Sequence, residues 1–200
     1  MIWSYHERNN AIMKNLEWCI YTYRHRKAFE YCVRKLVKEP ALREEMLRRA
    51  KVHDMDKMIM YLFLDQKEAQ KLHTGTKAHH LENDLPRTYE DFVEAVIDYE
   101  CAPYTKPDKP LNAYAFTKLL MEWKALDAET GGKLLAIIED LGIAYPSSVE
   151  DDREGQEYIN SFDNVTEEMI YEEILRYVNN NPGNELEEIL SIVNAGSETK

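Results

Sequence analysis

The run IMKNLEWCIYTYRHRKAFEYCVRKLV, residues 12–37, decides the fold class, because its apolar side chains recur at steps of three and four residues. The apolar positions are Ile12, Leu16, Cys19, Ile20, Tyr23, Phe29, Cys32, Val33 and Leu36. This spacing puts them on one face of an α-helix. No proline interrupts the run before Pro40, so the sequence predicts one long helix or two in close succession.

The same helical signals continue along the rest of the chain. Only 7 Gly and 7 Pro occur in 200 residues, and 44% of the residues are hydrophobic, enough to bury a core. Thr88, followed by Asp91 three residues later, has the pattern of a helix N-cap. Further helices are expected at residues 41–50, 113–126, 129–141 and 166–178. We therefore predict an all-α helical bundle at residues 10–143 and an acidic helical C-terminal appendage at residues 144–200.

The charge is distributed unevenly along the chain. Residues 1–50 hold 11 Lys and Arg against 6 Asp and Glu, whereas residues 141–200 hold 3 against 14, within a total net charge of −12. An acidic segment of this kind repels nucleic-acid backbones, so we expect no general nucleic-acid binding. A small phosphorylated molecule remains a suitable partner, because a local basic pocket or a metal ion can hold it.

The cysteines and the first residues indicate the compartment. Cys19, Cys32 and Cys101 are odd in number and form no Cys-x-x-Cys pair, which is typical of free thiols in a reducing cytoplasm. The chain opens with MIWSYHER, which has no apolar run. We expect a cytoplasmic protein with neither a signal peptide nor a membrane span.

All 6 histidines lie within the first 80 residues. They are His6, His25, His53, His73, His79 and His80. Neutral imidazole combined with carboxylate suits Mn, Fe, Co, Ni or Zn, so the clustering favours a divalent transition metal. A single inward-facing histidine such as His25 is more often a hydrogen-bonded core residue. A metal site is therefore indicated only by the histidines taken together.

Taken in order, His25, the His53-Asp54 doublet and Asp98 lie on successive predicted helices. This order resembles the HD-domain superfamily, an all-α family of metal-dependent phosphohydrolases named for its His-Asp doublet. The chain is also similar to small bacterial and phage HD-like proteins of unknown function. The matching stretches are His53-Asp54-Met55-Asp56-Lys57, His79-His80 with Pro86 following, and Ile97-Asp98-Tyr99-Glu100.

The resemblance implies a metal site formed by His25, His53, Asp54 and Asp98. Where the family binds two ions, further histidines lie between the doublet and the final Asp, and His73, His79 and His80 occupy that interval. One or two ions are therefore expected. Two alternatives remain open for these three residues: they are loop histidines on a solvated surface, or one of them, such as His80, hydrogen-bonds the substrate phosphate.

Lys57 is the main departure from the family pattern. Many phosphate-hydrolysing HD proteins have a Glu at this position, which handles the proton of the attacking water. A lysine is a poor base unless it is strongly desolvated, but it can hold a phosphate as a point charge. Asp56 and Glu100 are the candidate replacements for the missing acid or base. Alternatively, Lys57 is an exposed helix lysine that pairs with Asp54 or Asp56.

The segment after the last expected ligand contains three prolines and two cations, Lys106 and Lys109. A proline-stiffened loop with two cations would suit an anionic substrate. The same segment is equally compatible with an ordinary solvated loop.

These observations predict a metal-dependent phosphohydrolase that acts on a nucleotide or a related small phosphate ester. The departure at Lys57 and the acidic segment also allow a non-catalytic ligand-binding protein with the HD fold, for example in a phage–host setting. A di-iron oxygenase with the HD fold is the third hypothesis. We expect the acidic appendage to pack on the core, or on a second copy of the chain in a homodimer, and not to reach the metal.

Overall fold

A computed structural model describes residues 15–106, 111–143 and 152–180. Within these ranges every regular element is a helix, and the predicted all-α fold is confirmed. The run that decided the prediction forms one helix, α2 (Leu16–Leu36), of 21 residues. Among the same residues, no helix has both the length and the apolar character that crossing a membrane requires.

The chain forms two compact units, and each unit combines separate segments. Unit 1 contains Met1–Tyr23, Val52–Thr74 and Asn164–Lys200, and unit 2 contains Arg24–Lys51 and Gly75–Asp163. This division differs from the predicted boundary between residues 143 and 144. The reason is that the C-terminal segment is shared, because α9 (Arg153–Asn160) belongs to unit 2 and α10 (Glu167–Asn180) to unit 1.

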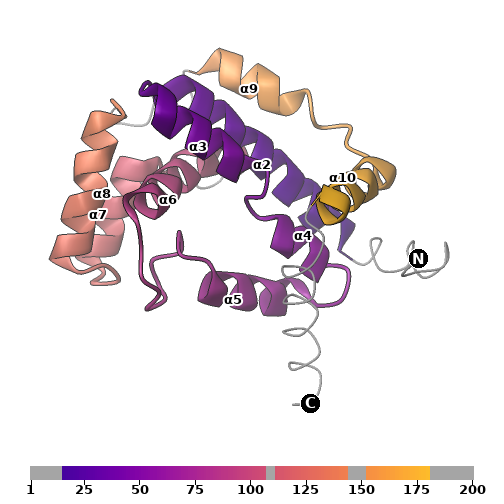
Figure 1. Cartoon of the computed structure of the whole chain (residues 1–200), viewed down its shortest axis with the longest axis horizontal. Helices are drawn as coiled ribbons and strands as arrows, with labels where there is room; N and C mark the ends of the chain where they lie inside the picture. The colour runs from indigo at the N-terminus through magenta and orange to yellow at the C-terminus, as the bar shows by residue number, and fades with distance from the viewer. Residues whose placement is uncertain (1–14, 107–110, 144–151, 181–200) are drawn as a thin grey trace. The chain divides into compact units, whose positions relative to one another are not determined.

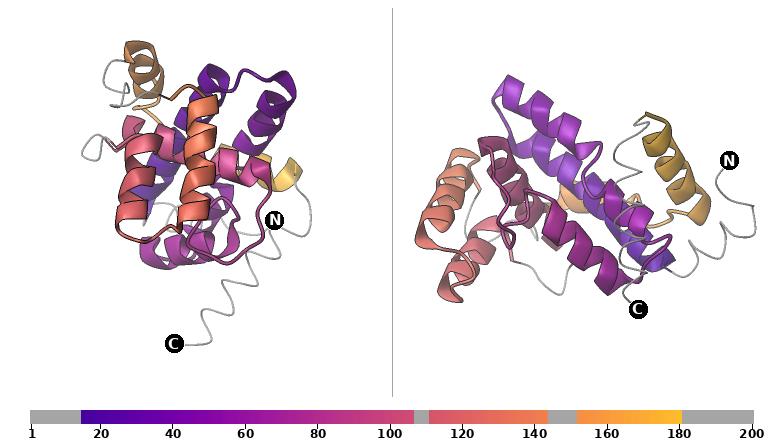
Figure 2. Two further views of the ribbon diagram at one scale, coloured as in Figure 1. Left: turned by 90° about the vertical axis from the view of Figure 1, so that its left-hand side faces the viewer. Right: turned by 60° about the horizontal axis from the view of Figure 1, so that its bottom comes forward.

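Unit 2 is built on α6 (Tyr89–Cys101), which packs against α3 (Pro40–Ala50), α7 (Ala113–Glu122) and α8 (Ala128–Asp140). The helices α7 and α8 lie side by side (Figures 1 and 2). Their apolar faces meet the second part of α2 in one core. Its fully buried members include Phe29, Cys32, Val33, Val37, Met46, Val93, Val96, Ile97, Cys101 and Leu134.

The ends of these helices follow from local capping. The Thr88 side chain accepts a hydrogen bond from the backbone N–H of Asp91, and the Asp91 side chain accepts one from the N–H of Thr88, so α6 begins with a capping box as its sequence predicted. Pro40 occupies the first turn of α3, where the lack of an N–H costs nothing. The Glu39 side chain caps the same helix by accepting from Ala41 and Leu42.

Asp152 anchors α9 within unit 2. Its carboxylate accepts hydrogen bonds from the hydroxyls of Tyr31 and Tyr104 and forms an ion pair of 2.6 Å with Lys35 Nζ. It is also the N-cap residue of α9, with its side chain accepting from the backbone N–H of Gly155. Gly155 lies so close to these side chains that an added Cβ would be 2.5 Å from Asp152 Oδ2 and 2.7 Å from the rings of Tyr31 and Tyr104.

Unit 1 contains α4 (Met55–Met60), most of α5 (Gln66–Thr76), α10 and the first part of α2. The helix α10 packs against α4, and its buried residues Ile170, Ile174 and Tyr177 form one stripe along the helix. The side chain of Asn15 donates two hydrogen bonds of 2.9 Å, to the carbonyl oxygens of Tyr61 and Leu64. These contacts fix the segment that follows α4.

All three cysteines of the chain are free and buried. Burial raises the pKa of the Cys19 thiol to about 12. The pKa of Cys32 is also raised well above its usual value, mainly by burial.

The packing around Gly155 predicts that G155A destabilises unit 2. Alanine normally favours a helix over glycine by up to about 1 kcal/mol. Here the added methyl group would overlap two aromatic rings, and overpacking of this kind costs roughly 1–3 kcal/mol. Gly132 in α8 is the matched control, because an added Cβ there meets nothing within 4 Å. Urea denaturation should show G155A less stable than wild type and G132A equal or more stable, and a G155A variant as stable as G132A would contradict the close packing.

Candidate metal centre

The His53-Asp54 doublet lies on a turn between α3 and α4. Asp54 has φ of 57° and ψ of 10°, the left-handed conformation, and α4 begins at the next residue. Such a conformation costs a non-glycine residue on the order of 1–2 kcal/mol, although Asp and Asn tolerate it better than most. The turn lets His53 and Asp54 leave the geometry of adjacent helical residues, whose side chains diverge by about 100°.

The Asp54 carboxylate is the centre of a buried donor set in unit 1. Its Oδ1 atom lies 3.0 Å from His73 Nε2 and 3.9 Å from His53 Nε2. The exposed fractions are 3% for Asp54, 3% for His53 and 0% for His73. Such burial is unusual for three polar side chains unless they are bonded to one another or to an ion.

The distances from Asp54 to the two imidazoles can be compared with those between ligands of one metal ion. Donor atoms about 2.1 Å from a shared ion lie roughly 3.0 Å apart at right angles and at most about 4.2 Å apart when opposite. The two distances from Asp54 Oδ1 fall within that range. Two imidazole nitrogens and one carboxylate oxygen are also the ligand types that Mn, Fe, Co, Ni and Zn accept. Asp54 together with either imidazole therefore supplies two of the donors that a metal ion needs. Among the described residues, His53, Asp54 and His73 are not a group in which all donor atoms lie within 4.8 Å of one another.

Lys57 holds the second oxygen of the same carboxylate. Its Nζ atom donates to Asp54 Oδ2 over 2.8 Å, and Lys57 is buried, with an exposed fraction of 9%. Burial by itself raises the pKa of the Asp54 carboxyl group. The positive charge of Lys57, together with the two neighbouring imidazoles, outweighs that effect and holds the pKa well below its usual range. Of the two interpretations of Lys57, the pairing with Asp54 is therefore found, but in a buried position.

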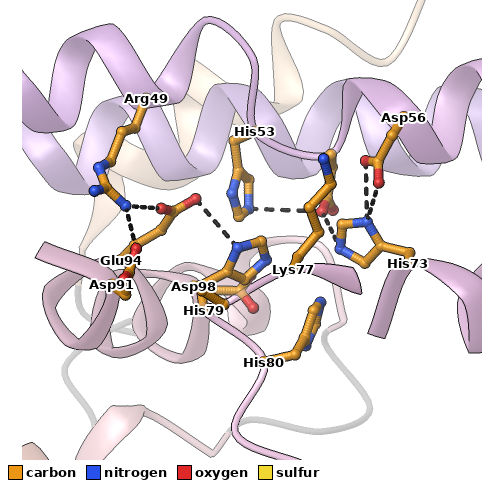
Figure 3. Close-up of polar contacts among 12 residues, drawn as sticks. Arg49, His53, Asp56, His73, Lys77, His79, His80, Asp91, Glu94 and Asp98 are labelled. Carbon is orange, nitrogen blue, oxygen red and sulfur yellow. Dashed lines mark hydrogen bonds and ion pairs between the residues drawn. The ribbon is translucent and has the colours of Figure 1, made fainter. Parts of the chain in front are cut away.

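Asp56 contacts the other side of the His73 ring (Figure 3). Its carboxylate oxygens lie 2.8 and 2.9 Å from His73 Nδ1. An imidazole that donates Nδ1–H to a carboxylate presents the lone pair of Nε2, the tautomer that suits a metal ligand. Asp56, considered from the sequence as an acid or base, thus lies where it would orient a ligand.

Unit 2 contains a second donor set around Asp98. His25 Nε2 lies 2.7 Å from Asp98 Oδ1, the length of a charge-assisted hydrogen bond. Cys101 Sγ is 3.7 Å from His25 Nδ1, and donor atoms of these three residues lie within 4.8 Å of one another. A ring nitrogen of His79 also lies within 4.8 Å of an Asp98 oxygen. His25, Asp98 and Cys101 form a group that could hold a metal ion.

His79 and His80 lie together in unit 2, with ring centroids 4.4 Å apart. His79 is buried and its Nδ1 atom is 3.3 Å from Glu94 Oε1, whereas the His80 side chain is 12% exposed. His73 is fully buried within α5. Neither His73 nor His79 is therefore a surface loop histidine.

The remaining predicted residues lie elsewhere in unit 2 or outside the described ranges. Glu100 accepts a hydrogen bond of 3.0 Å from the backbone N–H of Ala113, at the start of α7. Lys106 is exposed just after the short helix η1 (Ala102–Tyr104). Lys109 lies outside the described residues.

The expected ligands are thus divided between the units: His53, Asp54 and His73 belong to unit 1, and His25, Asp98, His79 and His80 to unit 2. Sequence reasoning missed Arg49, Glu94 and Cys101 as neighbours of these donors. No motif marks these three residues. Glu94, however, lies among the apolar residues of α6, and an acidic residue in such a position indicates a buried partner.

No protein-family model, curated protein or solved structure matches the chain. The side chains described above and the sequence resemblance are therefore what indicates a function.

The environment of Glu100 predicts a pH-dependent stability. Burial raises the pKa of its carboxyl group from 4.5 to about 7, against smaller opposing effects of Ala113 N–H and Lys35. Because the folded-state pKa is higher than the unfolded one, this group stabilises the protein fully below about pH 4.5, and the contribution is lost as the pH rises through 7. A shift of this size corresponds to on the order of 3 kcal/mol.

The E100Q variant tests this directly, because glutamine keeps the acceptor for Ala113 N–H but does not titrate. Urea denaturation in the presence of chelator, at a series of pH values from 4.5 to 8, should show wild type losing stability relative to E100Q. Parallel profiles for the two proteins would show that Glu100 does not titrate in this range.

Proposed function

We propose that this protein is a metal-dependent phosphohydrolase of the HD type that acts on a small phosphate ester, with nucleotides as the expected class. The observation that carries the proposal is the arrangement around Asp54. One carboxylate oxygen faces two buried imidazole nitrogens, and the other is held by a buried lysine ammonium. In this proposal, metal donors and a phosphate-binding cation share one carboxylate. His53 and Asp54 are the doublet on which the resemblance to HD proteins depends, whereas Lys57 is the departure from that pattern.

A divalent metal bound by such donors lowers the pKa of a bound water molecule and polarises a phosphoryl oxygen. Lys57 occupies Asp54 Oδ2, so Asp54 would bind the ion through Oδ1 alone. Asp56 holds His73 with Nε2 directed at Asp54. Lys57 and Asp56 would thus hold the ligating side chains in fixed orientations before any substrate binds.

Lys57 would also act on the substrate. An ammonium group has three N–H donors, so contact with Asp54 and with a phosphate oxygen are compatible. In a buried site its positive charge would stabilise the negative charge that develops on the phosphoryl oxygens during transfer. Placed beside a metal ligand, it would recognise the anion without replacing the donors.

A second candidate function is binding without turnover, and a specific observation favours it. Both carboxylates that could replace the missing glutamate have other partners: Asp56 contacts His73, and Glu100 contacts the start of α7. Incubation of metal-loaded protein with a nucleoside monophosphate, followed by assay of released phosphate, separates the two functions. Release supports the phosphohydrolase, whereas intact bound ligand supports the binding protein. Two irons per chain with visible absorbance would instead favour the oxygenase.

The metal assignment predicts that D54N removes the ion bound at Asp54. Asparagine tolerates the left-handed conformation of residue 54, so the variant removes the charge without adding backbone strain. Because D54N leaves the Lys57 ammonium without its carboxylate, the double variant D54N/K57M serves as the fold control. Elemental analysis of protein purified without chelator should show less metal per chain in both variants than in wild type, with helical circular dichroism retained in the double variant. A folded double variant with wild-type metal content would refute the assignment.

The role of Lys57 predicts weaker anion binding in K57A. A charged hydrogen bond contributes about 1.5–3 kcal/mol, so the affinity of the metal-loaded protein for a nucleoside monophosphate should fall about 10- to 100-fold. The matched control is K71A, which removes an exposed lysine of α5. Calorimetric titration gives both affinities. Equal affinities for K57A and K71A would show that Lys57 does not bind the phosphate. Faster phosphate release by K57E than by wild type would indicate that Lys57 favours ligand binding at the expense of hydrolysis.

A further inference from the structure

Glu94 is a buried carboxylate in α6 with two different partners (Figure 3). Its Oε2 atom accepts a hydrogen bond of 2.8 Å from Arg49 Nη1, and its Oε1 atom lies 3.3 Å from His79 Nδ1. The exposed fraction of Glu94 is 7%. All three residues belong to unit 2, on α3, on α6 and in the segment between α5 and α6.

Arg49 is itself held in place by several acidic side chains. Its Nη1 atom donates to Asp91 Oδ1 over 2.7 Å as well as to Glu94, and its Nε atom donates to Glu45 over 2.9 Å. A planar guanidinium with this many partners has little rotational freedom. The oxygen of Glu94 that faces Arg49 is therefore fixed, and so is the direction of the other oxygen, toward His79.

The contact with Glu94 decides which nitrogen of His79 carries the proton. A carboxylate only accepts hydrogen bonds, so it favours an imidazole that donates Nδ1–H. In that tautomer Nε2 presents a lone pair. One ring nitrogen of His79 lies within 4.8 Å of an Asp98 oxygen, and both residues belong to a group that could hold a metal ion. The same arrangement occurs in unit 1, where Asp56 contacts Nδ1 of His73.

We propose that Glu94, clamped by Arg49, is a positioning residue that holds His79 in the Nδ1–H tautomer so that Nε2 binds a metal ion. The inference rests on the proposed function only for the metal, because the tautomer is a property of the metal-free protein. It assigns a role to two residues, Arg49 and Glu94, that no sequence motif marks.

A purely structural tie between α3 and α6 would not need Glu94. Asp91 already joins α6 to Arg49 and also caps the helix. Burying a second carboxylate beside the same arginine carries a desolvation penalty, which a neutral side chain would avoid. What Glu94 adds, and Asp91 does not, is an acceptor directed at an imidazole.

The E94Q variant gives the sharpest test, because Arg49 offers only donors. The glutamine oxygen should turn to Arg49, which leaves the amide NH₂ facing His79 Nδ1. That nitrogen must then accept, so the proton moves to Nε2 and the lone pair needed for the metal is lost. The matched control is D91N, which alters the other acidic partner of Arg49 in α6 but leaves the acceptor beside His79.

Two measurements read the outcome. Long-range ¹H–¹⁵N correlation spectra of metal-free protein at about pH 8.5, well above the ordinary imidazole pKa, report the His79 tautomer. Titration with Co²⁺, followed by visible absorbance, reports metal affinity. We expect Nδ1–H in wild type and D91N and Nε2–H in E94Q, with Co²⁺ affinity lowered about 10- to 100-fold in E94Q and less than about threefold in D91N.

The double variant R49M/E94Q separates orientation from folding. Without Arg49, the glutamine oxygen can turn to His79, so the Nδ1–H tautomer and most of the Co²⁺ affinity should return. An E94Q protein that keeps Nδ1–H, or that changes tautomer and retains Co²⁺ affinity, would overturn the proposal. If wild type binds no Co²⁺, the metal-dependent function fails, while the tautomer spectra still decide whether Glu94 positions His79.

Discussion

A buried negative charge on Asp54 is the constraint on which unit 1 depends. The carboxylate sits in a left-handed turn, without exposure to water, and is compensated by Lys57 and by two imidazoles. Removing any one of these partners leaves a charge that the interior cannot solvate. The start of α4 and the buried face of α5 are therefore fixed by one electrostatic balance. A metal ion would add positive charge to that balance and shift it toward the deprotonated ligands.

The donor sets of the two units have the same arrangement of carboxylates and imidazoles. In each, an aspartate lies beside two histidines, and a further carboxylate contacts Nδ1 of one of them: Asp56 in unit 1 and Glu94 in unit 2. The outer carboxylate in unit 2 is supported by an arginine. Outer acidic groups of this kind raise the basicity of a ligating imidazole as well as orienting it. Both donor sets therefore contain a carboxylate in the position that outer acidic groups take beside metal-ligating histidines.

Much of the fold was predictable from local sequence, because helical periodicity and capping act over a few residues. The helix Leu16–Leu36, which lies within the predicted range 12–37, and the N-cap at Thr88 were predicted in this way. The division into units was not predictable, because it depends on which distant segments pack together. At the site, the residue types were indicated by their order along the chain. The contact of Glu94 with His79 and the left-handed turn at Asp54 arise only from tertiary packing.

The burial of every thiol in the chain has a practical consequence for spectroscopy. Maleimides and spin labels react with thiolates at the protein surface, and the raised pKa values of Cys19 and Cys32 keep both protonated at neutral pH. Cys101 is shielded in the same core as the apolar side chains of α6. A cysteine introduced on an exposed helix face would therefore be the preferred target of a reporter group. Distances between pairs of such reporters could be followed as metal is added, with all three native cysteines left in place.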